Sequence, residues 1–244
     1  MSDIETVAEI LSRSKRTAVL TGAGISAESG IPTFRGLGGL WNGRDPMSLA
    51  TPEAFASDPA TVWEFYRFRR DLVARSEPNP GHFALAELGR RYSSNFTLIT
   101  QNVDRLHQRA GSVDVLELHG NLFDVRCTGC RQTFDRDGVE LPPLPRCDDC
   151  GALLRPAVVW FGESLPQDVW QRAERAVEQA DALLVVGTSA LVYPAAGLVL
   201  TAAEHGCPVI EINLETTALS QFVDHALLGK SGEILPQLLA SLPA

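Results

Sequence analysis

The chain has 244 residues, of which 45% are hydrophobic and 21% are charged. This profile is typical of a soluble globular protein of one or two domains and excludes wholesale disorder. Lys and Arg number 21 against 30 Asp and Glu, which gives a formal net charge of −9. Such a charge repels a polyanion, so we expect no nucleic acid among the partners.

Short apolar runs alternate with helical patterns along the chain, which predicts an α/β fold with a parallel sheet flanked by helices. A helical pattern over residues 5–13 comes first, and strand patterns follow. The predicted strands are 17–21, 97–100, 115–118, 157–160, 183–186 and 209–212. The further predicted helices are 61–75, 81–91, 103–110, 167–179, 194–204 and 233–241.

Two segments interrupt this alternation and predict a smaller second lobe. Residues 36–76 are a loop and then a helix without a strand, and residues 127–150 are rich in turns, Pro and Cys. We therefore expect a main domain into which two modules are inserted. The main domain is 1–35, 81–120 and 157–244, the helical module is 36–80, and the cysteine-bearing module is 121–156.

The uncharged segment 182–203 is long enough to span a bilayer, but 187–189 and Pro194 interrupt it. We predict a buried strand and then a helix, because strands covered on both faces are apolar throughout. The acidic start of the chain has no apolar leader segment, so we expect a cytoplasmic protein with no membrane partner.

Four of the five cysteines form two C-x-x-C pairs, with sixteen residues between the pairs. Such pairs at this spacing predict a tetrahedral zinc site made of Cys127, Cys130, Cys147 and Cys150. Four thiolates leave no open coordination position, so the predicted zinc is structural. Two disulfides or a redox dithiol are the alternatives, and the missing leader disfavours disulfides. We predict that the remaining cysteine, Cys207, is a small buried apolar residue.

The first predicted strand runs directly into residues 22–27, GAGISA, which form a G-x-G-x-x-A sequence. Such a turn lets backbone N–H groups approach a pyrophosphate, which predicts dinucleotide binding; a plain tight turn is the alternative. Gly30-Ile31-Pro32 ends the following helix after about one turn. We expect the Gly-rich segment 33–39 to be a mobile loop that closes over a cofactor. In this loop Arg35 and Phe34 are candidates for contacts with the cofactor. The alternatives are that Arg35 is a solvated surface residue and that Phe34 packs in the core.

Residues 21–35, TGAGISAESGIPTFR, resemble the signature of the sirtuins, the NAD-dependent protein-lysine deacylases. The other similar motifs are 100–104 (TQNVD), 118–120 (LHG), the four cysteines, 159–163 (VWFGE), 187–189 (GTS) and 211–213 (EIN). The resemblance implies a Rossmann-like NAD-binding domain, a small lobe with one structural Zn²⁺, and acylated lysine side chains of other proteins as substrates. It leaves the oligomeric state open, and we expect a monomer.

In sirtuins NAD is consumed and no hydride is transferred. The acyl-lysine amide oxygen attacks the anomeric carbon of the nicotinamide ribose, which releases nicotinamide and leads to free lysine and O-acyl-ADP-ribose. By motif, the resemblance makes His119 the general base for the ribose hydroxyls, and Asn102 the residue that holds the reacting ribose and its water. A surface histidine is the alternative for His119. We interpret the other histidines as surface residues, namely His82, His107, His205 and His225.

The resemblance also implies the contacts to NAD. Gln101 touches a ribose hydroxyl, Asp104 holds the nicotinamide carboxamide, and Arg35 reaches the phosphates. Helix capping is the alternative for Asn102 and Asp104. The predicted NAD-binding residues are Gly22, Ala23, Gly24, Ile25, Ser26, Phe34, Arg35, Trp41, Gln101, Asn102, Val103, Asp104, Gly187, Thr188, Ser189, Asn213, Leu214, Glu215 and Ser231.

In the predicted helix 61–75, Tyr66 and Arg69 fall on the apolar stripe. An arginine on that face is costly unless it is paired or partly wet, and a snorkelling Arg69 is the alternative to a functional one. The pair is similar to the Tyr-x-x-Arg pair of the class III sirtuins, which remove succinyl and other acidic acyl groups. The charged residues predicted to lie outside the stripe are Glu64, Arg67, Arg70 and Asp71.

The resemblance therefore implies desuccinylation and demalonylation besides deacetylation. Tyr66, Arg69 and the small residue Ala27 are the predicted acyl-binding residues. A strand-like edge for the substrate peptide is predicted at Val159, Phe161 and Gly162.

Three other functions remain open on the sequence alone. They are an ordinary NAD oxidoreductase, a mono-ADP-ribosyltransferase of the same fold, and a non-enzymatic zinc-ribbon binding module. The broken first helix and the closed zinc site disfavour the oxidoreductase, and the acidic charge and the NAD motifs disfavour the binding module.

Overall fold

The structure is a computed structural model that describes residues 2–33, 41, 43–189, 192–218 and 220–243. The chain divides into two compact units. Unit 1 comprises residues 1–33, 77–118 and 166–244, and unit 2 comprises residues 34–76 and 119–165. The sequence-based division differs from this one chiefly at residues 157–165, which belong to unit 2.

Unit 1 contains a six-stranded parallel sheet in the order β3-β2-β1-β7-β8-β9. Strand β1 lies between β2 and β7, and Thr21 at its end pairs with Thr100 on one side and Val186 on the other. The strand order therefore reverses at β1, and ligands bind at such a switch point in open α/β sheets. The strands are β1 (Thr17–Thr21), β2 (Phe96–Thr100), β3 (Leu116–Glu117), β7 (Ala182–Val186), β8 (Val209–Asn213) and β9 (His225–Leu228).

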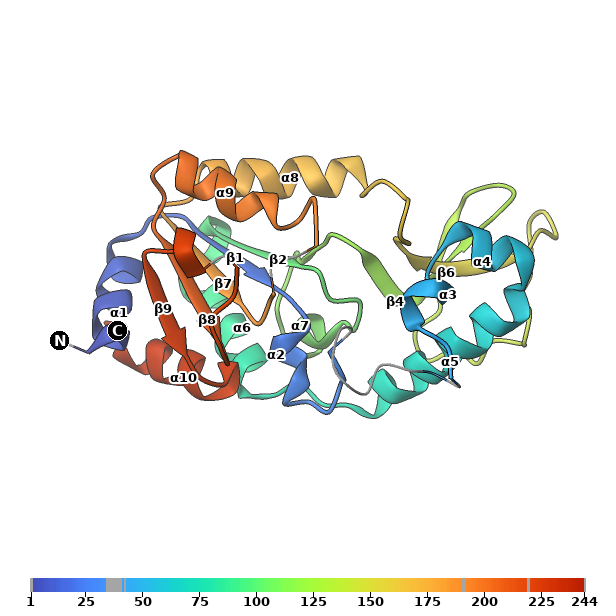
Figure 1. Ribbon diagram of the computed structural model, residues 1–244, viewed down its shortest axis with the longest axis horizontal. Coiled ribbons are helices and arrows are strands. Elements are labelled where there is room, and N and C mark those ends of the chain that lie inside the picture. The colour runs from blue at the N-terminus through green and yellow to red at the C-terminus, as the bar shows by residue number, and fades with distance from the viewer. Residues whose placement is uncertain (1, 34–40, 42, 190–191, 219, 244) are drawn as a thin grey trace. The chain divides into compact units, whose positions relative to one another are not determined.

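Helices cover both faces of this sheet, which confirms the predicted fold class (Figure 1). On one face α10 (Ser231–Ser241) packs on α1 (Asp3–Arg13) and α6 (Pro80–Tyr92). The other face is covered by α8 (Gln167–Glu178) and α9 (Gly197–Glu204). The short helical segments of unit 1 are α2 (Gly24–Ala27), α7 (Leu106–Arg109), η1 (Ser93–Asn95) and η2 (Ser220–Phe222).

The sheet core explains why the strands are apolar without alternation. Val19, Leu98, Leu184 and Ile210 lie in register under α1, α6 and α10. Their neighbours along the strands, such as Leu20, are equally buried against the other layer. The uncharged segment 182–203 is β7 followed by α9, as predicted. Among the described residues, no helix is long and apolar enough to cross a membrane.

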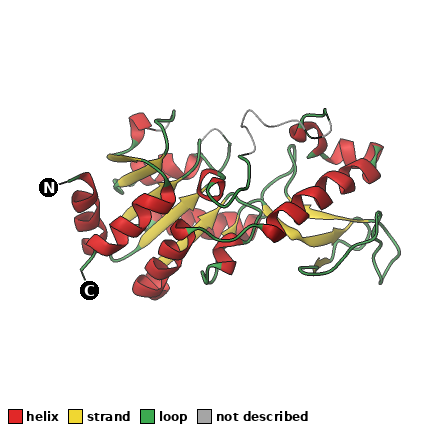
Figure 2. Ribbon diagram, turned by 90° about the horizontal axis from the view of Figure 1, so that it is seen from below, coloured by secondary structure: helices red, strands yellow, loops and turns green. Residues whose placement is uncertain are grey.

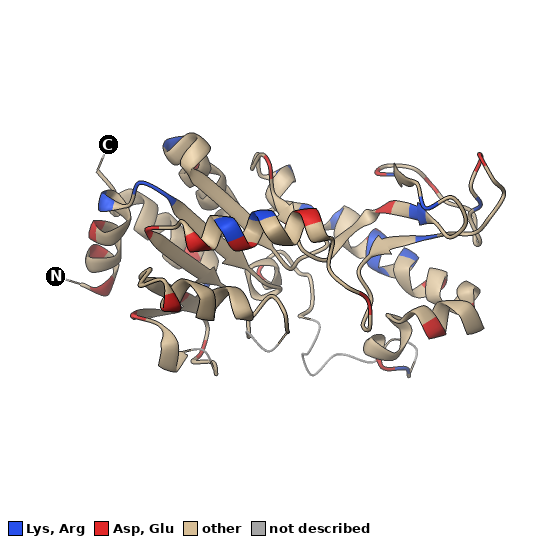
Figure 3. Cartoon of the chain, turned by 90° about the horizontal axis from the view of Figure 1, so that it is seen from above, with Lys and Arg blue, Asp and Glu red and all other residues tan. Residues whose placement is uncertain are grey.

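Local sequence determines where several helices of unit 1 begin. Ser2 and Glu5 form a capping box at α1, and Asn79 and His82 form a second at α6. Helix α8 buries Ala173 and Val177, and Figure 3 shows basic and acidic residues alternating along that helix.

Unit 2 contains a three-stranded antiparallel sheet in the order β5-β4-β6. Asp58 caps helix α5, and Pro59 occupies the first position of that helix. Helix α5 packs on β4 and β6 (Figure 2), and Trp63 Nε1 on it donates to Leu154 O at 2.9 Å. The elements are α3 (Pro46–Leu49), α4 (Pro52–Ser57), α5 (Pro59–Arg75), β4 (Gly120–Cys127), β5 (Thr133–Asp135) and β6 (Leu154–Val158).

Two sequence-based predictions about this unit are wrong. The strand predicted at 157–160 lies instead at Leu154–Val158 and runs antiparallel to β4, outside the parallel sheet. Arg70, predicted to lie outside the apolar stripe of α5, is buried, because its guanidinium donates to three backbone carbonyl groups. These hydrogen bonds offset the cost of burying its charge.

Candidate active site

The loop after β1 packs tightly against the loop after β7. Gly22 N–H donates to Val186 O at 3.0 Å, and Gly24 N–H donates to Gly187 O at 2.7 Å. A Cβ atom on Gly24 would lie 2.7 Å from Gly187 Cα, and Gly187 has a φ of +60°. Both positions therefore require glycine, and no side chain from either residue covers the backbone at the switch point. Helix α2 ends after one turn, as the sequence predicts.

Polar residues from three strand ends are hydrogen-bonded to one another beside this loop. Gln101 Nε2, after β2, donates to Thr188 Oγ1 at 3.0 Å. Asn213 Nδ2, at the end of β8, donates to Thr188 O at 3.0 Å. Thr188 is buried, and Ser189 next to it is exposed. The structure thus brings together, within unit 1, four residues predicted to bind NAD.

A second, buried cluster is centred on Ser26. His82 Nδ1 accepts from Asn79 N–H at 3.3 Å, so the ring proton is on Nε2, which lies 3.4 Å from Ser26 Oγ. Ser26 Oγ donates to Asp104 Oδ2 at 2.7 Å. Asn102 Nδ2 donates to Ser26 Oγ and to Gly22 O, both at 3.1 Å. Asn102, predicted to hold the reacting ribose, is therefore held in place by the glycine turn itself.

Helix capping was the alternative role for Asn102 and Asp104, and only Asp104 forms a hydrogen bond to the start of a helix, although the cap residue itself is Arg105. Helix α7 begins at Leu106, three residues later than predicted, and Asp104 Oδ1 accepts from Leu106 N–H at 2.9 Å. Asn102 lies too far from that helix to cap it and bonds to the glycine turn.

His82 and His107 are buried, so their interpretation as surface residues is wrong. Their side chains are 0% and 1% exposed, and the ring centres are 4.9 Å apart. His107 Nε2 lies 2.9 Å from Thr21 Oγ1, which itself donates to Thr100 Oγ1. Burial lowers the pKa of His82 to about 4 and that of His107 well below its usual value. Both rings are therefore neutral at physiological pH.

The lowered pKa values of His82 and His107 lead us to expect that the protein loses stability in mild acid. The unfolded chain binds more protons than the folded protein below about pH 6.5, because unfolded histidine titrates there. The free energy of unfolding should be at its full value above that pH. It should fall as the pH drops toward 4, by up to about 1.4 kcal/mol per pH unit for each histidine. Urea unfolding of the parent and His107→Gln over this range measures the difference in slope.

In this experiment the exposed His205 provides the control. His205→Gln should keep the slope of the parent, whereas His107→Gln should lose a share of it. A parent-like slope in His107→Gln would show that this ring is not held neutral.

In unit 2, Tyr66 and Arg69 lie one turn apart on α5. Tyr66 is fully buried, and its hydroxyl oxygen accepts from Trp160 Nε1 at 2.8 Å. Arg69 is partly exposed, with its guanidinium carbon 5.8 Å from the centre of the Tyr66 ring. Burial raises the pKa of Tyr66, and the charge of Arg69 offsets this only in part, so the phenol keeps its proton at neutral pH.

The segment predicted to bind the substrate peptide is fixed by backbone hydrogen bonds within unit 2. Val159 N–H donates to His119 O, and Phe161 N–H donates to Ala50 O, both at 2.9 Å. Gly162 has a φ of +86°, and Phe161 is 41% exposed. His119 is half-buried and lies directly before β4.

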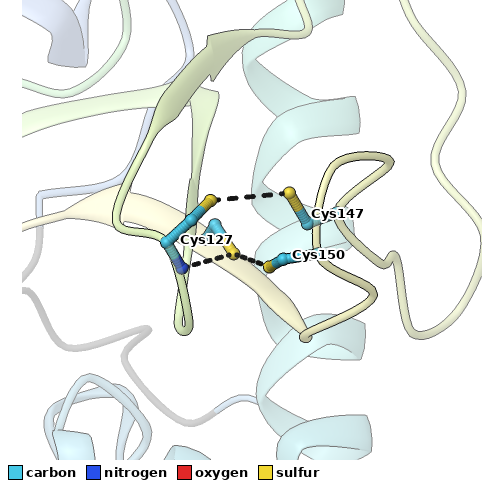
Figure 4. Close-up of side chains that lie close together, drawn as sticks. Cys127, Cys147 and Cys150 are labelled. Atoms are coloured by element: carbon cyan, nitrogen blue, oxygen red, sulfur yellow. Dashed lines mark hydrogen bonds between the residues drawn. The ribbon is translucent and has the colours of Figure 1, made fainter.

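The four sulfur atoms of the two C-x-x-C pairs lie within 4.8 Å of one another (Figure 4). Cys127 and Cys150 Sγ are 3.3 Å apart, and Cys130 and Cys147 Sγ are 3.7 Å apart. Four sulfurs at about 2.3 Å from a tetrahedral Zn²⁺ would be about 3.8 Å apart, so the cluster fits the ion. All four cysteines are free thiols, which excludes the disulfide alternative in this structure.

The remaining predicted site residues fall into three groups. Phe34 and Arg35 lie outside the described residues. Ser231 is buried at the start of α10, and its hydroxyl donates to Glu28 Oε1 at 3.2 Å, so part of its role is structural. Exposed or partly exposed are Ala23, Ala27, Trp41, Val103, Leu214 and Glu215, whereas Ile25 is buried.

Sequence reasoning missed two parts of this site. His82 sits in the Asn-Pro-Gly-His capping box of α6, and that sequence signal could have placed the ring at the start of this helix. Arg155 and Glu163 form a two-pronged ion pair around the predicted peptide-binding segment. The two residues are eight positions apart and meet only because the chain folds back after β6, which no local pattern indicates.

A model of the Sir2 family matches residues 22–194 of this chain. The NAD-dependent protein deacylase 1 of Archaeoglobus fulgidus is 52% identical over 236 residues, 96% of each chain. The chain belongs to the Sir2 family. Another relative is the NAD-dependent protein deacylase of Pyrococcus abyssi. It is 50% identical, and the match covers 96% of the present chain and 95% of the Pyrococcus protein. The resemblance to the sirtuins is therefore confirmed.

Solved structures of the Sir2 family have the same fold. A Sir2 homologue in complex with NAD is 52% identical, with a TM-score of 0.91 over 97% of this Sir2-family chain and 92% of that chain. A Sir2 protein bound to a myristoylated histone peptide is 38% identical, with a TM-score of 0.78 over 98% and 95% of the two chains.

Proposed function

We propose that this Sir2-family chain is an NAD-dependent protein-lysine deacylase that removes acetyl groups and also the acidic succinyl and malonyl groups. Nicotinamide, free lysine and O-acyl-ADP-ribose are the products. The general activity is supported chiefly by the hydrogen-bonded clusters at the switch point of unit 1, read together with the named activity of the relatives.

Unit 1 supplies the contacts to NAD in this proposal. The backbone of the glycine turn faces the pyrophosphate, and Gln101 and Asn102 bind the nicotinamide ribose. The amide nitrogen of Asn102 is already used by Ser26 and Gly22, whereas its amide oxygen has no hydrogen-bond partner among the described residues. That oxygen is available to accept from a ribose hydroxyl or a water. Asp104 holds the nicotinamide carboxamide, and Ser189, Asn213, Leu214 and Glu215 bind the adenosine half.

Unit 2 supplies the catalytic base and the acyl-lysine contacts. The imidazole of His119 takes a proton from a ribose hydroxyl, because an imidazole can accept and release a proton near neutral pH. The backbone of Val159, Phe161 and Gly162 binds the substrate peptide, and the four cysteines hold one structural Zn²⁺.

The acyl range is supported by Tyr66 and Arg69. The Tyr66 phenol is protonated, and its oxygen already accepts the indole N–H of Trp160, so its own proton is the one to be donated. Arg69 carries a planar guanidinium that can bind a carboxylate through two parallel hydrogen bonds. An acetyl group has no carboxylate and gains nothing from either residue.

Replacing Arg69 with Met should discriminate between acyl groups. A charged hydrogen bond contributes about 1.5–3 kcal/mol, so kcat/KM for a succinyl-lysine peptide should fall about ten- to a hundredfold for each bond lost. Deacetylation of the same peptide should change little, because the methyl group of acetyl makes no such bond. Steady-state rates on both peptides with NAD measure the ratio.

Arg75→Met is the matched control, because Arg75 is an exposed arginine at the C-terminal end of the same helix. This variant should leave the succinyl-to-acetyl ratio unchanged. An equal fall of both rates in Arg69→Met would mean that Arg69 does not bind the acyl carboxylate.

A further inference from the structure

We infer, on the basis of the proposed acyl range, that Trp160 is a positioning residue for acidic acyl groups. Its indole N–H orients the hydroxyl of Tyr66, and the ion pair of Arg155 and Glu163 fixes Trp160 in turn. Trp160 lies in the segment predicted to bind peptide, but it belongs to none of the site residues assigned above.

The first step is the contact between the two aromatic residues. Trp160 Nε1 lies 2.8 Å from the Tyr66 oxygen, and the two side chains are 2% and 0% exposed. An indole N–H can only donate, whereas a phenol has one proton and can also accept. Trp160 therefore fixes the Tyr66 oxygen as an acceptor on this side and directs the Tyr66 proton elsewhere. Among the described residues, no group accepts that proton.

The second step is that Trp160 cannot easily turn. The guanidinium carbon of Arg155 lies 3.3 Å from the centre of the Trp160 ring. Phe55 packs on the same indole, with the ring centres 5.4 Å apart. The indole is therefore held between a cation and an aromatic ring, and its N–H stays aimed at Tyr66.

The third step is that Arg155 and Glu163 hold the backbone of Trp160 as well. Arg155 Nη1 and Nη2 donate to the two carboxylate oxygens of Glu163 at 2.6 and 2.9 Å. Glu163 Oε2 also accepts from Trp160 N–H at 2.9 Å, and Arg155 Nη2 donates to Val158 O at 3.0 Å. Burial by itself would raise the pKa of Glu163, but the hydrogen bonds from Arg155 and Trp160 lower it overall, so the pair stays ionised at neutral pH.

A purely structural role for Trp160 predicts a different behaviour. A buried indole N–H needs only some acceptor, as Trp63 shows by donating to the backbone oxygen of Leu154. Trp160 instead donates to the one hydroxyl proposed to contact the acyl carboxylate. Loss of this donor leaves the phenol free to rotate, which weakens binding of a carboxylate and leaves binding of an acetyl group as it was.

Trp160→Phe tests the inference, because it removes the N–H and keeps an aromatic ring under Arg155. One neutral hydrogen bond is worth about a two- to tenfold change in affinity. We expect KM for a succinyl-lysine peptide to rise by about that factor, with kcat unchanged and both constants for the acetyl-lysine peptide within about twofold. Trp63→Phe is the matched control and should leave the succinyl-to-acetyl ratio of KM unchanged.

An NMR experiment tests the hydrogen bond without activity. In ¹⁵N-tryptophan-labelled protein, Trp160→Phe identifies the Trp160 indole N–H signal, which Tyr66→Phe should shift upfield while the Trp63 signal stays in place. A Trp160 signal unmoved by Tyr66→Phe overturns the inference.

The outcomes separate the inference from the function on which it rests. If the parent enzyme removes acetyl but no succinyl groups, the proposed acyl range is wrong, and the inference is overturned with it. If the parent removes both and Trp160→Phe changes the two KM values by the same factor, the inference alone is overturned. A selective rise of KM for the succinyl peptide supports both.

Discussion

Replacement of His119 with Ala is expected to lower kcat/KM for deacylation by about 10²- to 10⁴-fold, the usual contribution of a general acid or base. The backbone of His119 is held by a hydrogen bond in which its carbonyl oxygen accepts from Val159 N–H. Removal of the imidazole should therefore leave the fold in place. Release of nicotinamide from NAD in the presence of an acetyl-lysine peptide measures the rate.

The control for this prediction is His205→Ala, because His205 is an exposed histidine at the end of α9. This variant should retain the parent rate. Both variants should be compared after loading with zinc, so that a difference cannot come from the cysteine site. A zinc-loaded His119→Ala protein with the parent rate would contradict the assigned role.

Replacement of Cys147 with Ser is expected to remove zinc and to destabilise unit 2 strongly. Apparent zinc-binding free energies in small zinc peptides are about 10–16 kcal/mol near neutral pH, comparable to the total stability of a typical domain. The chain around the cluster offers little other support, because Cys130 and Cys150 are exposed and lie in turns. Zinc per chain by atomic absorption and thermal unfolding by circular dichroism measure the effect.

Cys207 provides the matched control, since it is a buried cysteine of unit 1 and lies outside the cluster. Cys207→Ser should keep one zinc per chain. If Cys147→Ser also bound one zinc and unfolded at the parent temperature, the cluster would not be a structural zinc site.

Elements with a strong local signal could be predicted from the sequence. Strand β1 has the predicted bounds Thr17–Thr21, and α2 ends after one turn, because a buried apolar run and the Gly30-Ile31-Pro32 sequence act locally. The cysteine cluster could be predicted for the same reason, since its spacing alone specifies four ligands.

The direction and partners of short strands could not be predicted. The segment predicted as a strand, 157–160, is as apolar as the parallel strands, whereas the observed strand β6 also contains Arg155 and Pro156. Only its pairing with β4 shows that it runs antiparallel in unit 2. Strand β9, His225–Leu228, has only four residues, too few for a clear periodic pattern, and it was not predicted at all.

Burial of polar side chains depends on contacts distant in sequence, which explains the other differences. Arg70 is buried because carbonyl groups near β4 receive its guanidinium, and His107 is buried because Thr21, 86 residues away, faces its ring. Helical periodicity cannot show either partner. The bond between Trp160 and Tyr66 spans 94 residues and was not predicted for the same reason.

Product analysis by mass spectrometry tests the central claim most directly. The parent protein is incubated with NAD and an acylated peptide, and all products are quantified. We predict equal amounts of nicotinamide, deacylated peptide and O-acyl-ADP-ribose, because the acyl group moves to the ribose as the glycosidic bond is broken. ADP-ribose attached to protein, or reduced NAD, in place of these three products would contradict the proposed reaction.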